Sequence, residues 1–463
     1  MNLNRRSFLI GTGVVAGTSM ASTLGINGFM DQGIASAPLL KEPERISSVN
    51  KVLNLNLEAS ELMVPFNGGK RWALAYNKSI PAPTLLAAPG DTLNLKLMNA
   101  TSLPTNLHTH GLHVSPAKNG DNPLIEIMPG ESFQYSIKIP KNQTSGTFWY
   151  HPHHHKFTAQ QVSGGLAGAI IIKDKIDSQS AFTTSSDRIL MFSDPRIGLN
   201  KSVLSTSMMD RAHGRSGPHV LINGALKPQI FAISSQAERW RLINACPSRY
   251  IDIRVENAEL LVISTDGGRL NAPAIVPSLV MTPGQRFEVV VSPTRTGRHR
   301  IYDGDVVIGE ILGSIRSANQ FAQTTLGSIA LLKVDKVRTI KIVGAGMMAM
   351  MGMSDHEQSF SFDGAAFNPK VVNQEVKLGD VEDWVIKNTS TMHHPFHIHA
   401  WDFQVVDRGD GRSESGWRDT INVPAHTSVR IRINFADFGG TTVYHCHILD
   451  HEDAGMMGIV RVA

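Results

Sequence analysis

The sequence predicts an all-β chain of about three domains. Residues 92–97 and 133–137 alternate apolar and polar side chains, which is typical of strands with one buried face. Pro-Gly pairs at 89–90 and 129–130 mark turns just before them, and no long stretch shows the helical period. With 463 residues, and roughly 150 residues in an average domain, three domains are expected.

The composition is that of a globular protein with many turns. Hydrophobic residues make up 41% of the chain, and there are 40 glycines and 23 prolines. The net charge of +4 is small and forms no basic stripe, so no nucleic-acid partner is expected. Only two cysteines are present, which excludes a disulfide framework, and we expect Cys246 to be a buried thiol.

The N-terminus has the pattern of an export signal. Arg5 and Arg6 precede a modestly apolar, glycine-rich run to about Gly17, and small residues follow as far as Ala37. We interpret residues 1–37 as a twin-arginine signal peptide and expect a periplasmic or otherwise exported protein. The run is shorter than the ~20 apolar residues that a membrane span needs, so no stable membrane insertion is expected.

The chain contains an internal repeat. Gly90 precedes Asn99 by nine residues and His108 by eighteen, and the same spacings recur after Gly379, which leads to Asn388 and His397. The repeat predicts that residues 45–175 and 336–463 are two copies of one domain.

A second pair of segments extends the repeat. Gly146 leads to His151 at the spacing with which Gly440 leads to His445. Residues two apart on a strand are separated by ~6.6 Å, close enough to serve neighbouring metals. The two copies together contain four His-x-His pairs, namely His108 and His110, His151 and His153, His397 and His399, and His445 and His447.

The middle segment, residues 180–335, lacks these pairs. Its stretches at 239–244 and 251–255 are strand-like, but its histidines show no ligand spacing. We therefore predict a third domain of the same kind without metal, a spacer that lets the other two face each other.

Cys446 occupies the central position of the last His-x-His pair. On a strand it faces one side, while His445 and His447 face the other. Two histidines, one thiolate and a weak thioether form a blue-copper site, and the residues available for it are His394, Cys446, His451 and Met456. Zinc is the commoner ion in short His/Cys clusters, but its structural sites have a closed shell of four ligands. The four His-x-His pairs together with the Cys446 group offer many more ligands than that and fit zinc poorly.

These four segments resemble the copper signatures of multicopper oxidases, in particular the three-domain branch of bacterial laccases, bilirubin oxidases and cuprous oxidases. The resemblance covers nearly the whole chain after residue 37. It implies three cupredoxin-like Greek-key β-barrels and four coppers per chain. By this resemblance His394, Cys446, His451 and Met456 hold type 1 copper, His108 and His397 hold type 2 copper, and the type 3 pair is held by His110, His151, His153, His399, His445 and His447.

The resemblance also implies an activity. One-electron oxidation of a phenolic or other organic reductant at the type 1 copper would be coupled to four-electron reduction of dioxygen to water at the other three coppers. Copper-free relatives that act as scaffolds have lost the ligands, whereas this chain keeps all of them. The expected partners are a small-molecule or metal-ion reductant and dioxygen, and we expect a monomer.

Two carboxylates are candidates for delivering protons. Glu452 directly follows His451, and Asp121 lies eleven residues after His110. Carboxylates beside ligating imidazoles orient them and hydrogen-bond metal-bound water. The alternative is a turn aspartate and a solvated glutamate.

The physiological reductant is the open question. Five methionines lie within residues 347–353 and either handle Cu(I) or fill apolar gaps. Cuprous oxidases of this family tend to have an acidic residue where this chain has Ser390. We therefore expect a laccase-like oxidase of organic reductants, with a cuprous oxidase of periplasmic copper homeostasis as the alternative.

Overall fold

The computed structural model describes most of the chain beyond the N-terminal segment. The predicted signal peptide, except for Ala37, and the methionines at 347–353 lie outside the described residues. No helix among those residues is long and apolar enough to cross a bilayer. The described residues are 37–66, 69–174, 177, 185–196, 206–232, 237–293, 295, 297–313, 332–344 and 360–463.

The first pair of sheets lies between residues 45 and 172. One sheet has the order β1-β4-β9-β8-β6 and the other the order β3-β2-β5-β7. The bounds are β1 (Arg45–Ser47), β2 (Val52–Phe66), β3 (Gly69–Tyr76), β4 (Ala82–Ala87), β5 (Thr92–Ala100), β6 (His108–His110), β7 (Ser132–Lys138), β8 (Gly146–His151) and β9 (Gly168–Ile172).

The middle pair of sheets lies between residues 185 and 312. The orders are β11-β10-β13-β18-β15-β16 and β12-β20-β19-β14-β17. The bounds are β10 (Ser185–Ser193), β11 (Leu221–Ile222), β12 (Gln229–Phe231), β13 (Ala237–Asn244), β14 (Ile251–Val255), β15 (Ala258–Thr265), β16 (Gly268–Val276), β17 (Leu279–Met281), β18 (Arg286–Pro293), β19 (His299–Asp303) and β20 (Val306–Leu312).

The third pair of sheets lies between residues 336 and 462. Its sheets have the orders β22-β21-β24-β28-β26 and β23-β30-β29-β25-β27. The bounds are β21 (Lys336–Gly344), β22 (Phe360–Phe362), β23 (Val372–Val376), β24 (Val381–Asn388), β25 (His394–Ile398), β26 (Phe403–Asp407), β27 (Thr420–Val423), β28 (Ser428–Asn434), β29 (Gly440–Cys446) and β30 (Met457–Val462).

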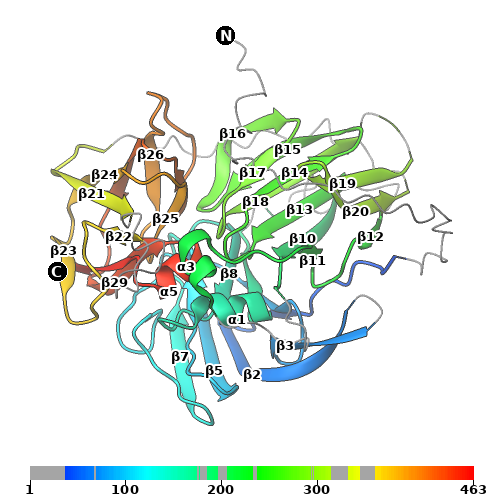
Figure 1. The fold of residues 1–463 in the computed structure, drawn as a ribbon, viewed down its shortest axis with the longest axis horizontal. Coiled ribbons are helices and arrows are strands. Elements are labelled where there is room, and N and C mark those ends of the chain that lie inside the picture. Colours follow the sequence, from blue (N-terminus) through cyan, green and yellow to red (C-terminus); the bar gives the residue numbers. More distant parts are fainter. Residues whose placement is uncertain are drawn as a thin grey trace, which may run out of the picture. The chain divides into compact units, whose positions relative to one another are not determined.

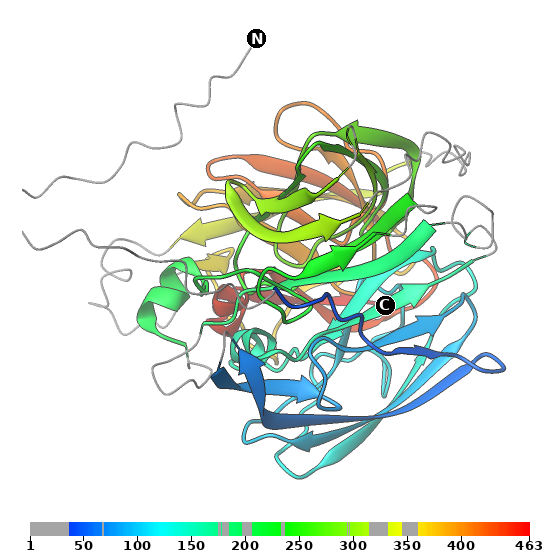
Figure 2. The same cartoon turned by 90° about the vertical axis from the view of Figure 1, so that its right-hand side faces the viewer.

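The three pairs of sheets repeat one topology, shown in Figures 1 and 2 as blue to cyan, green, and yellow to red ribbons. In each, the first long strand pairs in parallel with a later one, as β2 does with β5, β10 with β13 and β21 with β24. The prediction of an all-β fold is confirmed, and the domain boundaries stay predictions.

Alternating sequence places the core between the two sheets of each pair. Along β5, Leu93, Leu95 and Leu97 are fully buried, while the residues between them are partly or fully exposed. Separate apolar clusters fill the first, middle and third pairs. Burying apolar side chains in this way is the main stabilising contribution to each domain.

Three short helices lie side by side where the domains meet (Figure 1). They are α1 (Thr158–Gly164), α3 (Met208–His213) and α5 (Leu449–Asp453). His451, one of the residues available for the predicted blue-copper site, lies on α5, and every residue of this helix is buried. Five residues are too few for a helical period to be visible in the sequence.

Candidate metal centres

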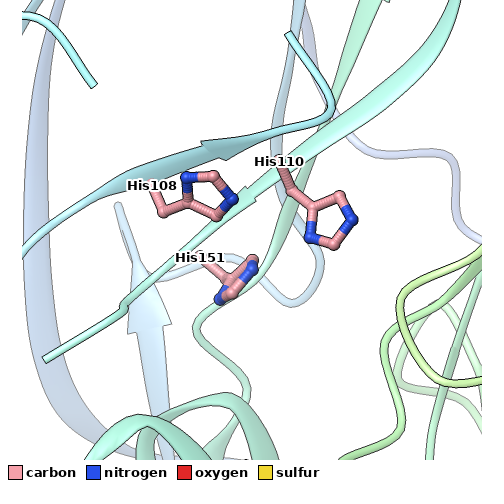
Figure 3. A group of neighbouring side chains, drawn as sticks. All are labelled: His108, His110 and His151. Carbon is pink, nitrogen blue, oxygen red and sulfur yellow. The ribbon is translucent and has the colours of Figure 1, made fainter. Parts of the chain in front are cut away.

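Strands β6 and β8 hold the first three histidines. His108 and His110 project from β6, and His151 ends β8, where it pairs with His108 across the sheet (Figure 3). All three are buried, and one ring nitrogen from each lies within 4.8 Å of the others. The spacing predicted from the repeat is therefore realised between neighbouring strands of one sheet.

Three further imidazoles converge from both copies of the repeat. The Nε2 atom of His153 lies 3.0 Å from Nε2 of His445 and 3.1 Å from Nε2 of His399. The last two nitrogens are 3.2 Å apart. Three nitrogen atoms directed at one point are the arrangement that a metal ion needs.

The remaining two predicted cluster residues complete the group. His397 stacks on His110 with ring centroids 3.9 Å apart, and His447 lies with its centroid 5.0 Å from that of His110. The structure thus brings all eight predicted histidines together, four from each copy. We call them the histidine cluster: His108, His110, His151, His153, His397, His399, His445 and His447.

Several cluster imidazoles have one nitrogen bonded and the other free. His108 donates from Nδ1 to Asp121 at 2.9 Å, and its Nε2 has no partner among the described residues. His151 donates from Nδ1 to the carbonyl oxygen of Pro152 at 2.8 Å, and its Nε2 is likewise free. A bonded nitrogen fixes the tautomer and leaves a directed lone pair on the other, as in metal-binding histidines.

Burial keeps these imidazoles neutral. Burial is the largest cause that lowers the pKa of His151 to about 3 and that of His153 to about 4, and neighbouring imidazoles contribute to both values. Neutral imidazole is the form that binds metal, and imidazole suits copper. Buried free nitrogens and neutral rings therefore fit the copper ions that the sequence predicts for this cluster.

The second predicted group gathers around Cys446, as expected from strand alternation. Its Sγ lies 3.5 Å from Nδ1 of His394 and 3.9 Å from Nδ1 of His451. Met456 is fully buried in the same apolar cluster as Cys446, and its carbonyl oxygen accepts the Cys446 N–H at 3.1 Å. We call these four residues the Cys446 site.

The imidazole of His394 is oriented by Ser390. His394 donates from Nε2 to the Ser390 hydroxyl oxygen at 3.0 Å, and this hydroxyl donates to Asn388 at 2.8 Å. Nδ1 is therefore the nitrogen directed at Cys446. Burial lowers the pKa of His394 to about 3 and raises that of the Cys446 thiol above its ordinary value, so a cation is needed to hold the thiolate.

Both predicted carboxylates lie beside the histidine cluster, and neither is on the surface. Asp121 accepts from His108 and from the Thr109 N–H, and burial raises its pKa to about 7. Glu452 lies 3.1 Å from Nδ1 of His445. Neither of its buried oxygens makes a well-aligned hydrogen bond within the described part of the chain. These positions suit the predicted role in proton transfer, which stays a prediction.

Asp419 and Arg286 are site residues that were not predicted from the sequence. Asp419, just before β27, accepts from Nε2 of His110 at 3.0 Å, and Arg286 at the start of β18 donates to both of its oxygens. Burial would raise the pKa of Asp419, but Arg286 and His110 hold it well below its ordinary value. No spacing signals these residues, because Asp419 lies outside the His motifs and Arg286 in the domain predicted to be a spacer.

The middle domain therefore does more than separate the other two. Besides Arg286, its turn at Gly284 lies against the cluster, where a Cβ would approach Cδ2 of His447 to 2.7 Å. None of the predicted metal-ligating residues lies in this domain, but its Arg286 and Gly284 contact Asp419 and His447 at the histidine cluster.

Comparison with known proteins agrees with this geometry. Models of domains described as multicopper oxidase match residues 58–177, 197–305 and 344–463. A multicopper oxidase of Staphylococcus epidermidis is 31% identical over 402 residues, covering 84% of this chain and 83% of the relative. The chain belongs to the multicopper oxidase family. Members of this family are copper oxidoreductases.

Solved structures and more distant relatives add detail. The multicopper oxidase of Campylobacter jejuni, described as a metallo-oxidase, has a TM-score of 0.83 and 31% identity, covering 92% of this chain and 95% of its own. The cell division protein FtsP of Xenorhabdus nematophila is 25% identical over 99% of this chain and 98% of its own. One relative of this chain is thus named for a different role.

Proposed function

We propose that this multicopper oxidase is laccase-like. It would oxidise phenolic or other organic reductants one electron at a time at the Cys446 site and reduce dioxygen to water at the histidine cluster. Bound copper would supply the one-electron redox steps. One ion at the Cys446 site and three in the histidine cluster, four per chain, are the expected complement.

The observation that carries this proposal is the position of Cys446. It belongs to one site, while the residues on either side of it, His445 and His447, belong to the other. One tripeptide thus links the two groups covalently. A scaffold protein would need neither the buried neutral imidazoles nor this link.

An organic reductant is favoured by the surroundings of His394. Ser390 is buried and neutral, and its hydroxyl is already engaged by His394 and Asn388. A cation approaching this side of the Cys446 site would find no carboxylate at that position. A hydroxyl in this environment is a poor ligand for a copper ion.

A metal ion is the second candidate reductant, and two observations favour it. The Campylobacter jejuni relative is described as a metallo-oxidase. In addition, Met208 and Met209 are 62% and 66% exposed on α3, which packs against the helix that carries His451. Exposed thioethers are soft ligands of the kind that select Cu(I).

Oxygen uptake with a panel of phenols and with Cu(I), at matched enzyme concentration, tests the proposal. We expect higher kcat/KM with at least one phenol than with Cu(I). Met208→Leu and Met209→Leu should leave phenol oxidation unchanged. A much higher kcat/KM for Cu(I), reduced in these two variants, would make the protein a metal-ion oxidase.

We further propose that the protein is exported by the twin-arginine route and acts as a monomer. The support for export is the Arg5-Arg6 pair followed by an apolar run. Arg5→Lys and Arg6→Lys together should retain the protein in the cytoplasm. Fractionation measures its location, and gel filtration of the exported chain measures its mass.

A further inference from the structure

Arg286 forms a bidentate ion pair with Asp419 at the edge of the histidine cluster. Its side chain is fully buried, and it donates from Nη1 and Nη2 to the two oxygens of Asp419 at 2.8 and 2.5 Å. Its Nε donates to the carbonyl oxygen of Thr147 at 3.2 Å, and its backbone N–H donates to Asp266 at 2.7 Å. The guanidinium is therefore fixed from several directions.

Asp419 in turn holds two cluster histidines, one from each copy of the repeat. Its carboxylate accepts from Nε2 of His110 at 3.0 Å, and its carbonyl oxygen accepts from Nδ1 of His397 at 2.8 Å. In both rings the other nitrogen, Nδ1 of His110 and Nε2 of His397, is buried without a partner in the described part of the chain. One residue thus sets the tautomer of two rings.

The chain beside His110 leaves room for this arrangement. At Gly111 a Cβ would lie 2.2 Å from Nη2 of Arg286 and 2.5 Å from an oxygen of Asp419. Its φ of +86° is also one that residues with a side chain rarely adopt. Only glycine fits at this point of the motif.

We propose that Arg286 is a positioning residue for the histidine cluster: the metal-free middle domain holds Asp419, and through it directs one nitrogen each of His110 and His397 to the metal. The proposal rests on the proposed copper cluster. Without the guanidinium, a buried carboxylate would lose the partner that offsets its desolvation. The carboxylate would rotate and the ring of His110 would lose its orientation, while the backbone carbonyl that holds His397 would lose the anchor beside it.

Arg286→Met and Arg286→Lys test the role, with Arg241→Met as the matched control. Arg241 is an equally buried arginine of the middle domain whose hydrogen bonds go to Asp187, Thr147 and Glu288. Copper per chain, the type 2 electron paramagnetic resonance signal and copper release to a chelator are measured on the purified holoprotein. Losing a residue that orients a ligand typically lowers metal affinity about 10- to 100-fold.

We expect Arg286→Met to release cluster copper at about 10- to 100-fold lower chelator concentration and to alter the type 2 signal. Arg286→Lys keeps the charge but lacks the planar guanidinium that binds both oxygens of Asp419. Its copper affinity should therefore lie between those of Arg286→Met and the wild type, and its type 2 signal should still be altered. If Arg286→Met does not fold, the copper affinity and type 2 signal of Arg286→Lys test the positioning role. Arg241→Met should lower the melting temperature while its type 2 signal stays that of the wild type.

Unchanged signal and copper affinity in both Arg286 variants would overturn the proposal. Equal copper loss in Arg241→Met would also overturn it, because the effect would then be general destabilisation. A wild-type chain that binds no copper at the cluster would instead refute the proposed function itself.

Discussion

At the residue scale, hydrogen bonds from neighbouring residues decide which ring nitrogen of each histidine is free to bind a metal. Asp121 accepts a hydrogen bond from Nδ1 of His108, and Asp419 accepts one from Nε2 of His110. In the same way the Ser390 hydroxyl accepts one from Nε2 of His394. The nitrogen left over is in each case the one that faces its site. Tautomers are thus set by neighbours before any metal binds, which lowers the cost of organising the ligands.

Cys446→Ser is the most direct test of the Cys446 site. Charge transfer from a thiolate to Cu(II) gives such sites their intense blue colour, which a hydroxyl cannot supply. We expect the variant to lose the colour and reductant oxidation but to keep the type 2 resonance signal. Cys246→Ser, which replaces a buried thiol of the middle domain, should stay blue. A blue Cys446→Ser protein would refute the assignment.

Glu452→Gln tests proton delivery to the histidine cluster. The amide keeps the shape of the side chain but cannot carry a proton, and general acid–base steps typically contribute about 100-fold or more. Reoxidation of the fully reduced protein by dioxygen, followed by stopped flow, should slow by about that factor. Asp121→Asn should behave similarly. Copper content and reduction of the Cys446 site are the internal controls and should not change. An unchanged rate of reoxidation in both variants would show that neither carboxylate delivers protons.

At the element scale, a helix of only five residues, α5, carries the predicted ligand His451. Helix α5 is held by the middle domain, where Arg215 donates from Nε to Asp450 at 3.0 Å. It is also held by α1, whose Thr158 N–H donates to Asp453 at 3.0 Å. Tertiary contacts rather than helix propensity therefore position His451.

Arg215→Met should destabilise the metal-free chain by about 3–5 kcal/mol, because it leaves the buried Asp450 carboxylate without its partner. Denaturant unfolding measures the change. Arg412→Met removes a comparable ion pair with Asp410 on the surface and should have little or no effect. Equal effects of the two variants would show that burial of the Arg215 pair does not matter.

Local patterns in the sequence mark only some of the residues that make up the two sites. Strand alternation and the repeat are local patterns, so the eight cluster histidines and Cys446 could be placed from spacing alone. The bond from Arg286 to Asp419 joins residues 133 apart in the chain, in two different domains. Nothing periodic marks such a contact, and a single buried arginine resembles any other in the sequence.

At the scale of the whole molecule, a buried polar network joins the first and middle domains through the Thr147 hydroxyl. Thr147 on β8 of the first domain donates to Glu288 on β18 at 2.8 Å. Glu288 also accepts from Arg239 at 2.6 Å and from Arg241 at 2.5 Å. The network therefore links β8 of the first domain to β13 and β18 of the middle domain.

This network predicts acid sensitivity. Burial alone would raise the pKa of Glu288, but Arg239 and Arg241 lower it to about 2, below the ordinary ~4.3 of an unfolded chain. A depressed carboxylate pKa stabilises the fold above the unfolded value, and this contribution disappears as the pH falls to the folded value. The stabilisation from Glu288, roughly 3 kcal/mol, should therefore be lost between about pH 4 and pH 2.

Denaturant unfolding of the metal-free chain between pH 5 and pH 2 measures this loss without interference from copper release. Glu288→Gln should be less stable than the wild type at pH 5, and the difference should shrink as the pH falls. Glu375→Gln, which changes an exposed carboxylate paired with Arg461, should follow the wild-type pH dependence. If the wild type and Glu288→Gln instead lost stability in parallel, the arginines would not be holding Glu288 ionised. The domain contact would then depend on packing, and acid would be expected to act first at the exposed carboxylates.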